Sequence, residues 1–155
     1  MKRFVIVLAS VLNLVLADAV VKELAAGCLK GSAAVPVIPG LFNLAYVENR
    51  GCAWGMFQGQ VWPLAIFGLV ALASLVWKRR AVFGPGKLAA VAEPLLYAGI
   101  VGNVIDRLFR GFVIDMFDFH WGAHHFPCFN VADSLICVSV GLLLLASFLT
   151  KPSAR

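Results

Sequence analysis

Long apolar stretches dominate the pattern of hydrophobic and polar positions along the chain. They predict membrane-spanning helices at about 4–21, 61–77, 88–106 and 131–150. Each stretch is close to the roughly 20 residues that cross a bilayer as a helix. None alternates strongly between apolar and polar residues, as expected when lipid-facing and protein-facing sides must both be apolar. The pattern therefore predicts an all-α membrane protein with four transmembrane helices.

The composition supports this fold class and excludes others. The chain has 155 residues, of which 61% are hydrophobic and 14% are charged, and its mean hydropathy is +0.90. A soluble domain usually has about 25% charged residues. A large soluble catalytic domain is therefore excluded. We expect a single membrane domain over 1–155, with any chemistry on the helices or their short connections.

The distribution of basic residues predicts the orientation of the helices. Eight of the 13 basic residues lie in segments that contain no acidic residue, namely Lys2, Arg3, Lys78, Arg79, Arg80, Lys87, Lys151 and Arg155. Lysine and arginine collect in cytoplasmic segments. Both termini and the turn at 78–87 are therefore predicted to be cytoplasmic, with outer segments at 22–60 and 107–130. The net charge of +5 is then a topology signal, and no nucleic-acid partner is predicted.

The N-terminal segment also resembles two kinds of processing signal. Lys2 and Arg3, an apolar core and Ala17-Asp18-Ala19 are similar to a cleavable secretory signal. The run 24–28, which ends at a cysteine, resembles a lipoprotein cleavage site, but Lys22 and Glu23 separate it from the apolar core. Because cleavage would leave three spans and no partner for Asp18, we expect this segment to remain as the first helix.

The first outer segment combines turn-forming residues with a run typical of a β-strand. Glycines and prolines between 27 and 40 precede the run at 41–47, which is rich in aromatic and branched residues. This pattern predicts a short β-hairpin or small sheet at the membrane surface.

Polar residues gather at the outer end of the third predicted helix. Gly99, Asn103 and Asp106 follow helical spacing and share one face, with Arg107 one turn beyond Asn103. Gly99 and Gly102 would allow a neighbouring helix or a peptide to approach the backbone closely. The alternative is that Asp106 and Arg107 mark the membrane boundary and that the glycines only pack helices.

Two further acidic residues lie near the start of the fourth helix. Asn130 is a suitable N-cap, and a carboxylate at Asp133 would complement the helix dipole. Asp115 lies within a run of large apolar residues that is expected to be a strand or buried. If Asp115 and Asp133 met, they would form a carboxyl pair in unequal environments that could share one proton near neutral pH.

Such a pair could hydrolyse an amide without a covalent intermediate, because one carboxylate can activate water while the other donates a proton. No metal or cofactor is then required. His120, His124 and His125 crowd one loop but lack the helical spacing of a metal site. We therefore predict that they lie in a solvated outer loop.

Three polar blocks resemble one known family. The blocks 102–107, 113–117 and 129–133 resemble, in order and spacing, the lipoprotein signal peptidase family, or signal peptidase II. Asp18 with Lys22 and the segment 46–55 resemble its upstream elements, although Cys52 and Trp54 replace its usual small residue and phenylalanine.

The resemblance implies an aspartic endopeptidase that removes signal peptides from diacylglyceryl-modified prolipoproteins. It would cleave on the N-terminal side of the lipidated cysteine and would have an outer β-cradle between helices 1 and 2. Its partners would be lipid-modified signal peptides and membrane lipid. It would lie in the bacterial inner membrane, with the active site at the outer face, and it would be a monomer.

The resemblance also assigns roles to individual residues. Asp115 and Asp133 would be the catalytic dyad; spacing alone could not choose Asp115 over Asp118. The implied substrate-binding or dyad-supporting residues are Asn49, Asn103, Asp106, Arg107 and Asn130. The implied structural supports are Asp18, Lys22, Gly99 and Gly102.

Two other classes of protein share parts of this pattern. A membrane thiol-disulfide oxidoreductase would use Cys28, Cys52 and Cys128 on the oxidising side, but the chain has no C-x-x-C pair and Cys137 lies within a helix. A small channel subunit could use rim aspartates to attract cations. The cysteines could equally fill space or form one incidental disulfide.

Overall fold

The computed structural model describes residues 2–149. The predicted cytoplasmic tail with Lys151 and Arg155 lies outside the described residues. The helices are α1 (Lys2–Leu29), α2 (Val61–Trp77), α3 (Arg79–Val82), α4 (Lys87–Phe109) and α5 (Val131–Leu149), with one 3-10 turn, η1 (Ala53–Gly55). The strands are β1 (Val35–Ile38), β2 (Phe42–Asn49), β3 (Val113–Trp121) and β4 (His124–His125).

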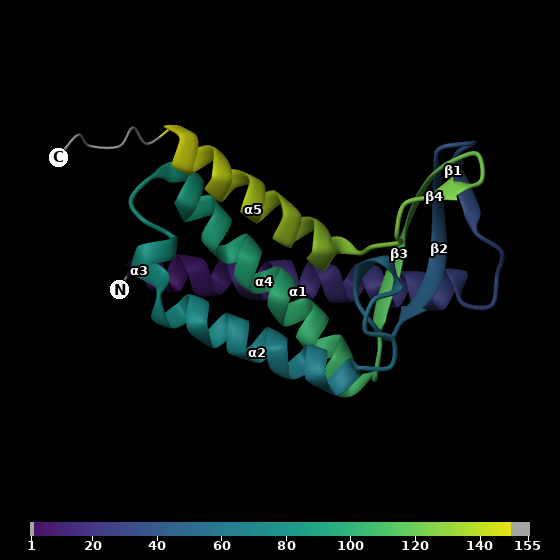
Figure 1. The fold of residues 1–155 in the computed structure, drawn as a ribbon, viewed down its shortest axis with the longest axis horizontal. Helices are drawn as coiled ribbons and strands as arrows, with labels where there is room; N and C mark the ends of the chain where they lie inside the picture. Colours follow the sequence, from purple (N-terminus) through teal and green to yellow (C-terminus); the bar gives the residue numbers. More distant parts are fainter. Residues whose placement is uncertain (1, 150–155) are drawn as a thin grey trace.

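The long helices lie side by side, and the strands extend beyond one end of them (Figure 1). α4 is the central helix and packs against α1, α2 and α5. Within the described range, α1, α4 and α5 are long and apolar enough to cross a membrane, whereas the apolar α2 is shorter, with 17 residues. Side chains such as Leu12, Phe67 and Leu144 are mostly exposed, as expected for surfaces that face lipid.

α1 is longer than the apolar stretch that predicted it. The expected helix ended at 21, but α1 continues to Leu29, so the outer segment begins as helix. Lys22 does not end the helix because its ammonium group is buried between two carboxylates, Asp18 at 2.8 Å and Asp106 at 2.9 Å. The added turns bury Ala25 against β3, and a glycine with positive φ, Gly31, follows the helix end.

The sheet is antiparallel, in the order β1-β2-β3-β4. The predicted strand at 41–47 corresponds to β2, and the predicted hairpin is β1 with β2. The expectation that the cradle lies between the first two membrane helices is incomplete, because β3 and β4 come from the segment between α4 and α5. The run around Asp115 forms β3 and is buried over its first four residues, as its apolar character indicated.

Two glycines of α4 allow the start of α5 to approach closely. A Cβ atom at Gly99 would lie 2.4 Å from the carbonyl oxygen of Ala132, and one at Gly102 would lie 2.6 Å from Oδ2 of Asp18. Both distances are shorter than any real contact. The predicted close approach at these glycines is therefore present, and it brings the N-terminus of α5 against α1 and α4.

The opposite end of the bundle contains a second buried charge. Glu93 of α4 is fully buried and forms ion pairs with Arg3 of α1, at 2.9 Å, and with Arg79 of α3. Phe83 and Tyr97 pack edge to face beside it. These contacts join α1, α3 and α4 at the end remote from the sheet.

Candidate active site

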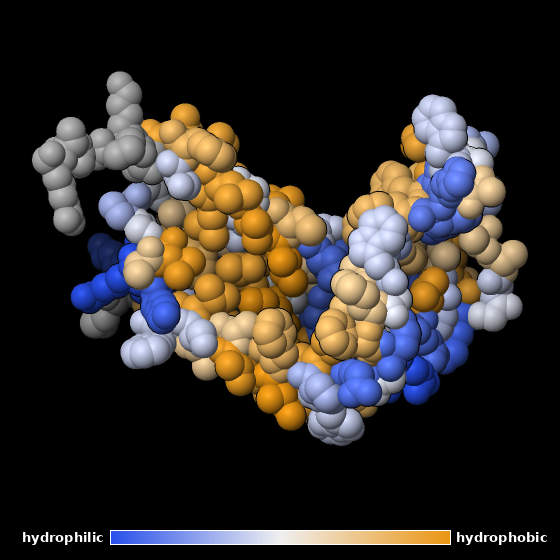
Figure 2. Space-filling view, viewed as in Figure 1, coloured by the Kyte–Doolittle hydropathy of each residue, from blue (hydrophilic) through white to orange (hydrophobic). Residues whose placement is uncertain are grey.

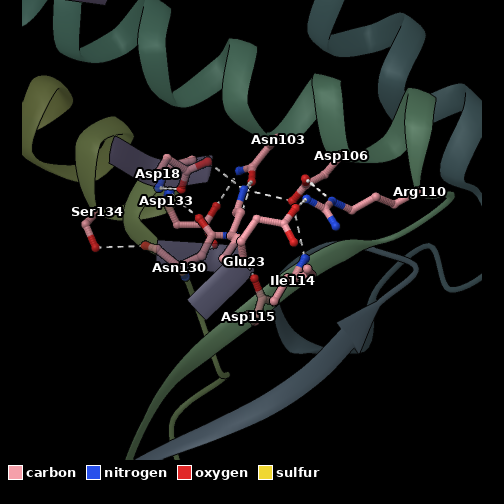
Figure 3. Close-up of polar contacts among 12 residues, drawn as sticks. Asp18, Glu23, Asn103, Asp106, Arg110, Ile114, Asp115, Asn130, Asp133 and Ser134 are labelled. Atoms are coloured by element: carbon pink, nitrogen blue, oxygen red, sulfur yellow. Dashed lines mark hydrogen bonds and ion pairs between the residues drawn. The ribbon is translucent and has the colours of Figure 1, made fainter. Parts of the chain in front are cut away.

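The predicted polar residues meet where the sheet joins the helices (Figure 3). Asp115 comes from β3, and Asp133 from the first turn of α5. Asn130 lies just before α5, and Asn103 reaches the same point from α4. Side chains from three separate segments therefore converge on one small buried region.

Asp115 is buried and has a hydrogen bond on each carboxyl oxygen. Asn49 Nδ2 donates to its Oδ2 at 2.9 Å, and Asn130 Nδ2 donates to its Oδ1 at 2.7 Å. Burial, and then the negative charge of Asp133, raise the pKa of Asp115 to about 7 although both hydrogen bonds oppose the shift. This carboxyl group can therefore keep or release a proton near neutral pH.

Asp133 and Asn130 cap the start of α5 reciprocally. The Asp133 N–H donates to Asn130 Oδ1 at 2.9 Å, and the Asn130 N–H donates to Asp133 Oδ2 at 3.3 Å. Asn103 Nδ2 donates to the other oxygen of Asp133 at 2.7 Å. The prediction that Asn130 is the N-cap is confirmed. Because Asn130 Nδ2 also donates to Asp115, this one residue contacts both carboxyl groups, through its side chain at Asp115 and through its backbone N–H at Asp133.

A buried network of charges supports Asn103 and the start of α5. Lys22 Nζ donates to Asn103 Oδ1 at 3.4 Å while it pairs with Asp18 and Asp106. Asp18 Oδ1 accepts a hydrogen bond from the Ala132 N–H at 2.9 Å, which fastens α1 to α5. The predicted supporting residues are thus adjacent to the carboxyl pair, although none of these three contacts either member directly.

Arg107 links α4 to the loop that follows β2. Its guanidinium group donates to the carbonyl oxygen of Gly51 at 3.0 Å and to that of Asn103 at 3.3 Å. Gly51 has no room for a side chain, because a Cβ would lie 2.5 Å from the Met56 carbonyl oxygen. The Gly51 N–H in turn donates to Asn49 Oδ1 at 2.9 Å, so Arg107 helps to position Asn49, at the end of β2, next to Asp115.

Two cavities adjoin the carboxyl pair. The space-filling view shows a hollow between the helices and the sheet (Figure 2). The sheet cavity has a volume of about 490 Å³ and is lined by residues that include Glu48, Gln58, Asp115, Asp118 and His125. The helix cavity, of about 520 Å³, is lined by residues that include Asn103, Arg107, Asp133, Ile136 and Val138. Both cavities share Asn49, Cys52, Ala53, Phe126, Pro127 and Cys128. The two aspartates therefore border different cavities on either side of a common wall.

Sequence reasoning missed one cluster in the sheet cavity. His125 Nδ1 lies 2.6 Å from Asp118 Oδ1, and Asn43 Nδ2 donates to Asp118 Oδ2 at 3.0 Å. Burial alone would raise the pKa of Asp118, but the hydrogen bonds from His125 and Asn43 outweigh it and lower the pKa below its usual value. The histidines were expected in a loop. His120 instead lies near the end of β3, and His124–His125 form β4. Only the turn residues between these strands could have signalled the hairpin.

The cysteines do not form a redox centre in this structure. All four lie within residues 2–149 and are free thiols. Burial raises the pKa of the Cys128 thiol to about 12, whereas a reactive cysteine needs a thiolate. No cluster of histidine, cysteine or acidic residues suited to a metal occurs in the described part of the chain. The chemistry that this arrangement supports best is proton transfer between two carboxyl groups.

Comparisons with known proteins show the family of this chain. The model of the family described as signal peptidase (SPase) II matches residues 10–149. The lipoprotein signal peptidase of Syntrophotalea carbinolica is 40% identical over 149 residues, which cover 94% of this chain and 92% of that protein. That of Geobacter metallireducens is 44% identical over 114 residues, with 72% and 70% covered. A solved bacterial membrane enzyme aligns with a TM-score of 0.81 at 30% identity, over 96% of this chain and 94% of its own. The chain therefore belongs to the signal peptidase II family of peptidases.

Proposed function

We propose that this protein is an aspartic endopeptidase that removes the signal peptide from diacylglyceryl-modified prolipoproteins. Cleavage takes place on the N-terminal side of the lipidated cysteine, and Asp115 and Asp133 are its catalytic residues. The observation that carries this proposal is that Asn130 hydrogen-bonds to both carboxyl groups, with its side chain to Asp115 and with its backbone N–H to Asp133, and so joins them in one site. Neither a metal nor a cofactor takes part.

Asp133 acts as the general base and Asp115 as the general acid. Asp133 lies in the first turn of α5, where a helix N-terminus stabilises negative charge, so it takes a proton from water. The resulting hydroxide attacks the amide carbonyl carbon while Asp115, with its raised pKa, gives a proton to the carbonyl oxygen. The tetrahedral intermediate then collapses as the proton on Asp133 passes to the leaving nitrogen and Asp115 recovers its own. Neither carboxyl group is consumed.

The position of the site suits a substrate anchored in lipid. A signal peptide is an apolar helix, and the diacylglyceryl group must remain in the bilayer. The site lies where the helices end and the sheet begins, so it meets a bond presented at the membrane surface (Figure 1). In this proposal α2 is the fourth span, both termini are cytoplasmic, and the sheet lies on the outer face of the bacterial inner membrane. The enzyme acts as a monomer because one chain contains both aspartates.

A cleavage assay tests the proposal and its rival together. Purified protein is incubated with a precursor peptide that carries diacylglyceryl-cysteine, and the shortened product is detected on a gel. Asp115→Asn and Asp133→Asn are each expected to lower kcat by at least about a thousandfold, because each removes a group that transfers protons. Replacement of all four cysteines is expected to leave most of the activity.

The matched control is Glu23→Gln, an acid-to-amide change at an exposed residue whose contact is an ion pair with Arg110. This variant is expected to retain activity. Cleavage by either aspartate variant at the rate of the parent protein would exclude the dyad. Loss of activity only in the cysteine-free protein would favour the oxidoreductase.

A further inference from the structure

The sheet cavity and the helix cavity differ in the residues that line them. The helix cavity is bordered by apolar residues of the membrane helix α5, including Ile136 and Val138, whereas strand and loop residues border the sheet cavity. A peptide drawn across the carboxyl pair would pass from one cavity to the other. This inference rests on the proposed function, since it concerns the same substrate on the other side of its scissile bond.

The direction of the substrate follows from this difference. The signal peptide and the lipid chains belong in the bilayer, so they lie on the side of the helix cavity. The mature lipoprotein is polar and lies outside the membrane, so its first residues must leave across the sheet cavity. That cavity has a volume of about 490 Å³, which is enough for a few residues.

The sheet cavity also has a distinct charge. The carboxylates of Glu48 and Asp118 border it beside the proposed acid Asp115, and none of its lining residues among those described is a lysine or arginine. The exposed side chains of Lys30 and Arg50 pair with Glu48 from outside that lining, each at 3.4 Å. A negative cavity wall attracts basic groups and repels carboxylates.

His125 adds a directed acceptor to this wall. Its Nδ1 faces the Asp118 carboxylate, which can only accept, so Nδ1 carries a hydrogen; whenever the ring is neutral, Nε2 is then an acceptor. The ring stacks on His120 with centroids 4.9 Å apart, and about half of the His125 side chain is exposed. A backbone N–H or a side-chain donor of the substrate could therefore bind Nε2.

We propose that the sheet cavity binds the residues that directly follow the lipidated cysteine. Glu48, Asp118 and His125 determine its specificity and favour basic or hydrogen-bond-donating residues over acidic ones at these positions. Asp118 acts partly through His125, which it holds in place, and partly through its charge.

The test compares precursor peptides that differ only in the two residues after the lipidated cysteine. These residues are two serines, two lysines or two glutamates, and kcat/KM is measured for each. The parent protein is expected to cleave the lysine peptide about tenfold more efficiently than the glutamate peptide, because each exposed charge contact changes binding only a few-fold. In a second pair of peptides, with the same charges ten residues further on, the ratio should be near one.

Two variants identify the residues responsible. Glu48→Gln and Asp118→Asn are each expected to lower the lysine-to-glutamate ratio about threefold, whereas His124→Gln, a change at the neighbouring exposed residue of β4, should leave it unchanged. A purely structural role for Asp118 would lower the rates of all peptides alike and would not alter this ratio. Glu48 is partly exposed, so its variant tests the inference even if Asp118→Asn fails to fold.

The possible results separate the two proposals. If the parent protein cleaves none of the peptides, the proposed function is wrong. If it cleaves all three equally, the enzyme is a signal peptidase but the sheet cavity does not select the residues after the cysteine. If the lysine-to-glutamate ratio of kcat/KM is unchanged in both variants, the assignment of Glu48 and Asp118 is wrong.

Discussion

Asp115 and Asp133 are the same amino acid, but their surroundings differ in the way that acid and base catalysis requires. Asp115 receives two neutral amide donors inside the sheet, from Asn49 and Asn130. Asp133 instead lies at a helix N-terminus and accepts hydrogen bonds from the Asn130 backbone N–H and from Asn103 Nδ2. Asn130 contacts both groups, and the negative charge of Asp133 raises the pKa of Asp115. The protonation of Asp115 therefore depends on the charge of Asp133.

This arrangement predicts the pH dependence of cleavage. The proposed acid, Asp115, must be protonated, and its pKa is about 7. The protonated fraction falls as pH rises, so kcat/KM should decline about tenfold per unit well above pH 7. Asn49→Ala removes a hydrogen bond that favours the charged form, which raises the pKa of Asp115 further. The alkaline limb of the profile should therefore move to higher pH.

The matched control for this prediction is Asn43→Ala. Asn43 is also an asparagine of β2 that donates to an aspartate of β3, but its partner is Asp118. Its replacement should leave the position of the alkaline limb unchanged. A limb that stays in place or moves to lower pH in Asn49→Ala would show that Asp115 is not the titrating acid.

The sequence indicated which polar residues belong to the candidate site, but it did not indicate which of them form hydrogen bonds with one another. The N-cap role of Asn130 follows from local chemistry, so it could be read directly from the chain. The choice between Asp115 and Asp118 could not be read from the chain. Both are aspartates of β3, and both border the sheet cavity. Their partners, Asn130 and His125, are brought to them by the folding of the chain after β3. Those contacts leave no local pattern.

At the scale of elements, α1 shows how a buried charge can extend a helix. Lys22 would be costly in an apolar environment, but it lies against Asp18, one helical turn earlier, and against Asp106 of α4. Counting apolar residues ended the helix at this lysine because the count could not include Asp106, a partner 84 residues away along the chain. Once these charges are paired, α1 continues and its last turns support β3.

This network predicts a large loss of stability when its cation is removed. Lys22→Met keeps the length of the side chain but leaves the buried Asp18 carboxylate without its cation and Asp106 with Arg110 alone, which should cost about 3–5 kcal/mol. Lys30→Met removes an exposed lysine paired with Glu48 and should change stability little. Unfolding of both variants in detergent, followed by circular dichroism, measures the difference. Equal stability of the two variants would contradict a supporting role for Lys22.

At the scale of the whole molecule, the sheet was the least predictable part. The hairpin of β1 and β2 has a local signal, but β3 pairs with β2 from a segment more than 60 residues away. The long helices lie at the predicted places because their apolar length is a property of each segment alone, although α1 continues beyond its predicted end at 21 to Leu29. The candidate site combines both kinds of structure, so its polar residues were visible in the sequence but the two cavities were not.

The ends of the bundle predict the topology of the protein in the membrane. The start of α1, the α2–α4 connection and the end of α5 lie together at the end remote from the sheet (Figure 1). Arg3 and Arg79 are held there by Glu93, and Lys78, Arg80 and Lys87 add positive charge. Lysine and arginine in short loops resist translocation. This end should therefore be cytoplasmic and the sheet should lie outside.

Reporter fusions test this orientation. A reporter enzyme that is active only outside the cytoplasm should be silent when it is fused after Lys87, because α1 and α2 together return the chain to the cytoplasmic side. The same reporter fused after Gly122, in the turn between β3 and β4, should be active because α4 carries the chain outward again. Activity after Lys87 combined with silence after Gly122 would invert the topology. The carboxyl pair would then face the cytoplasm, where it could not meet a precursor presented at the outer surface.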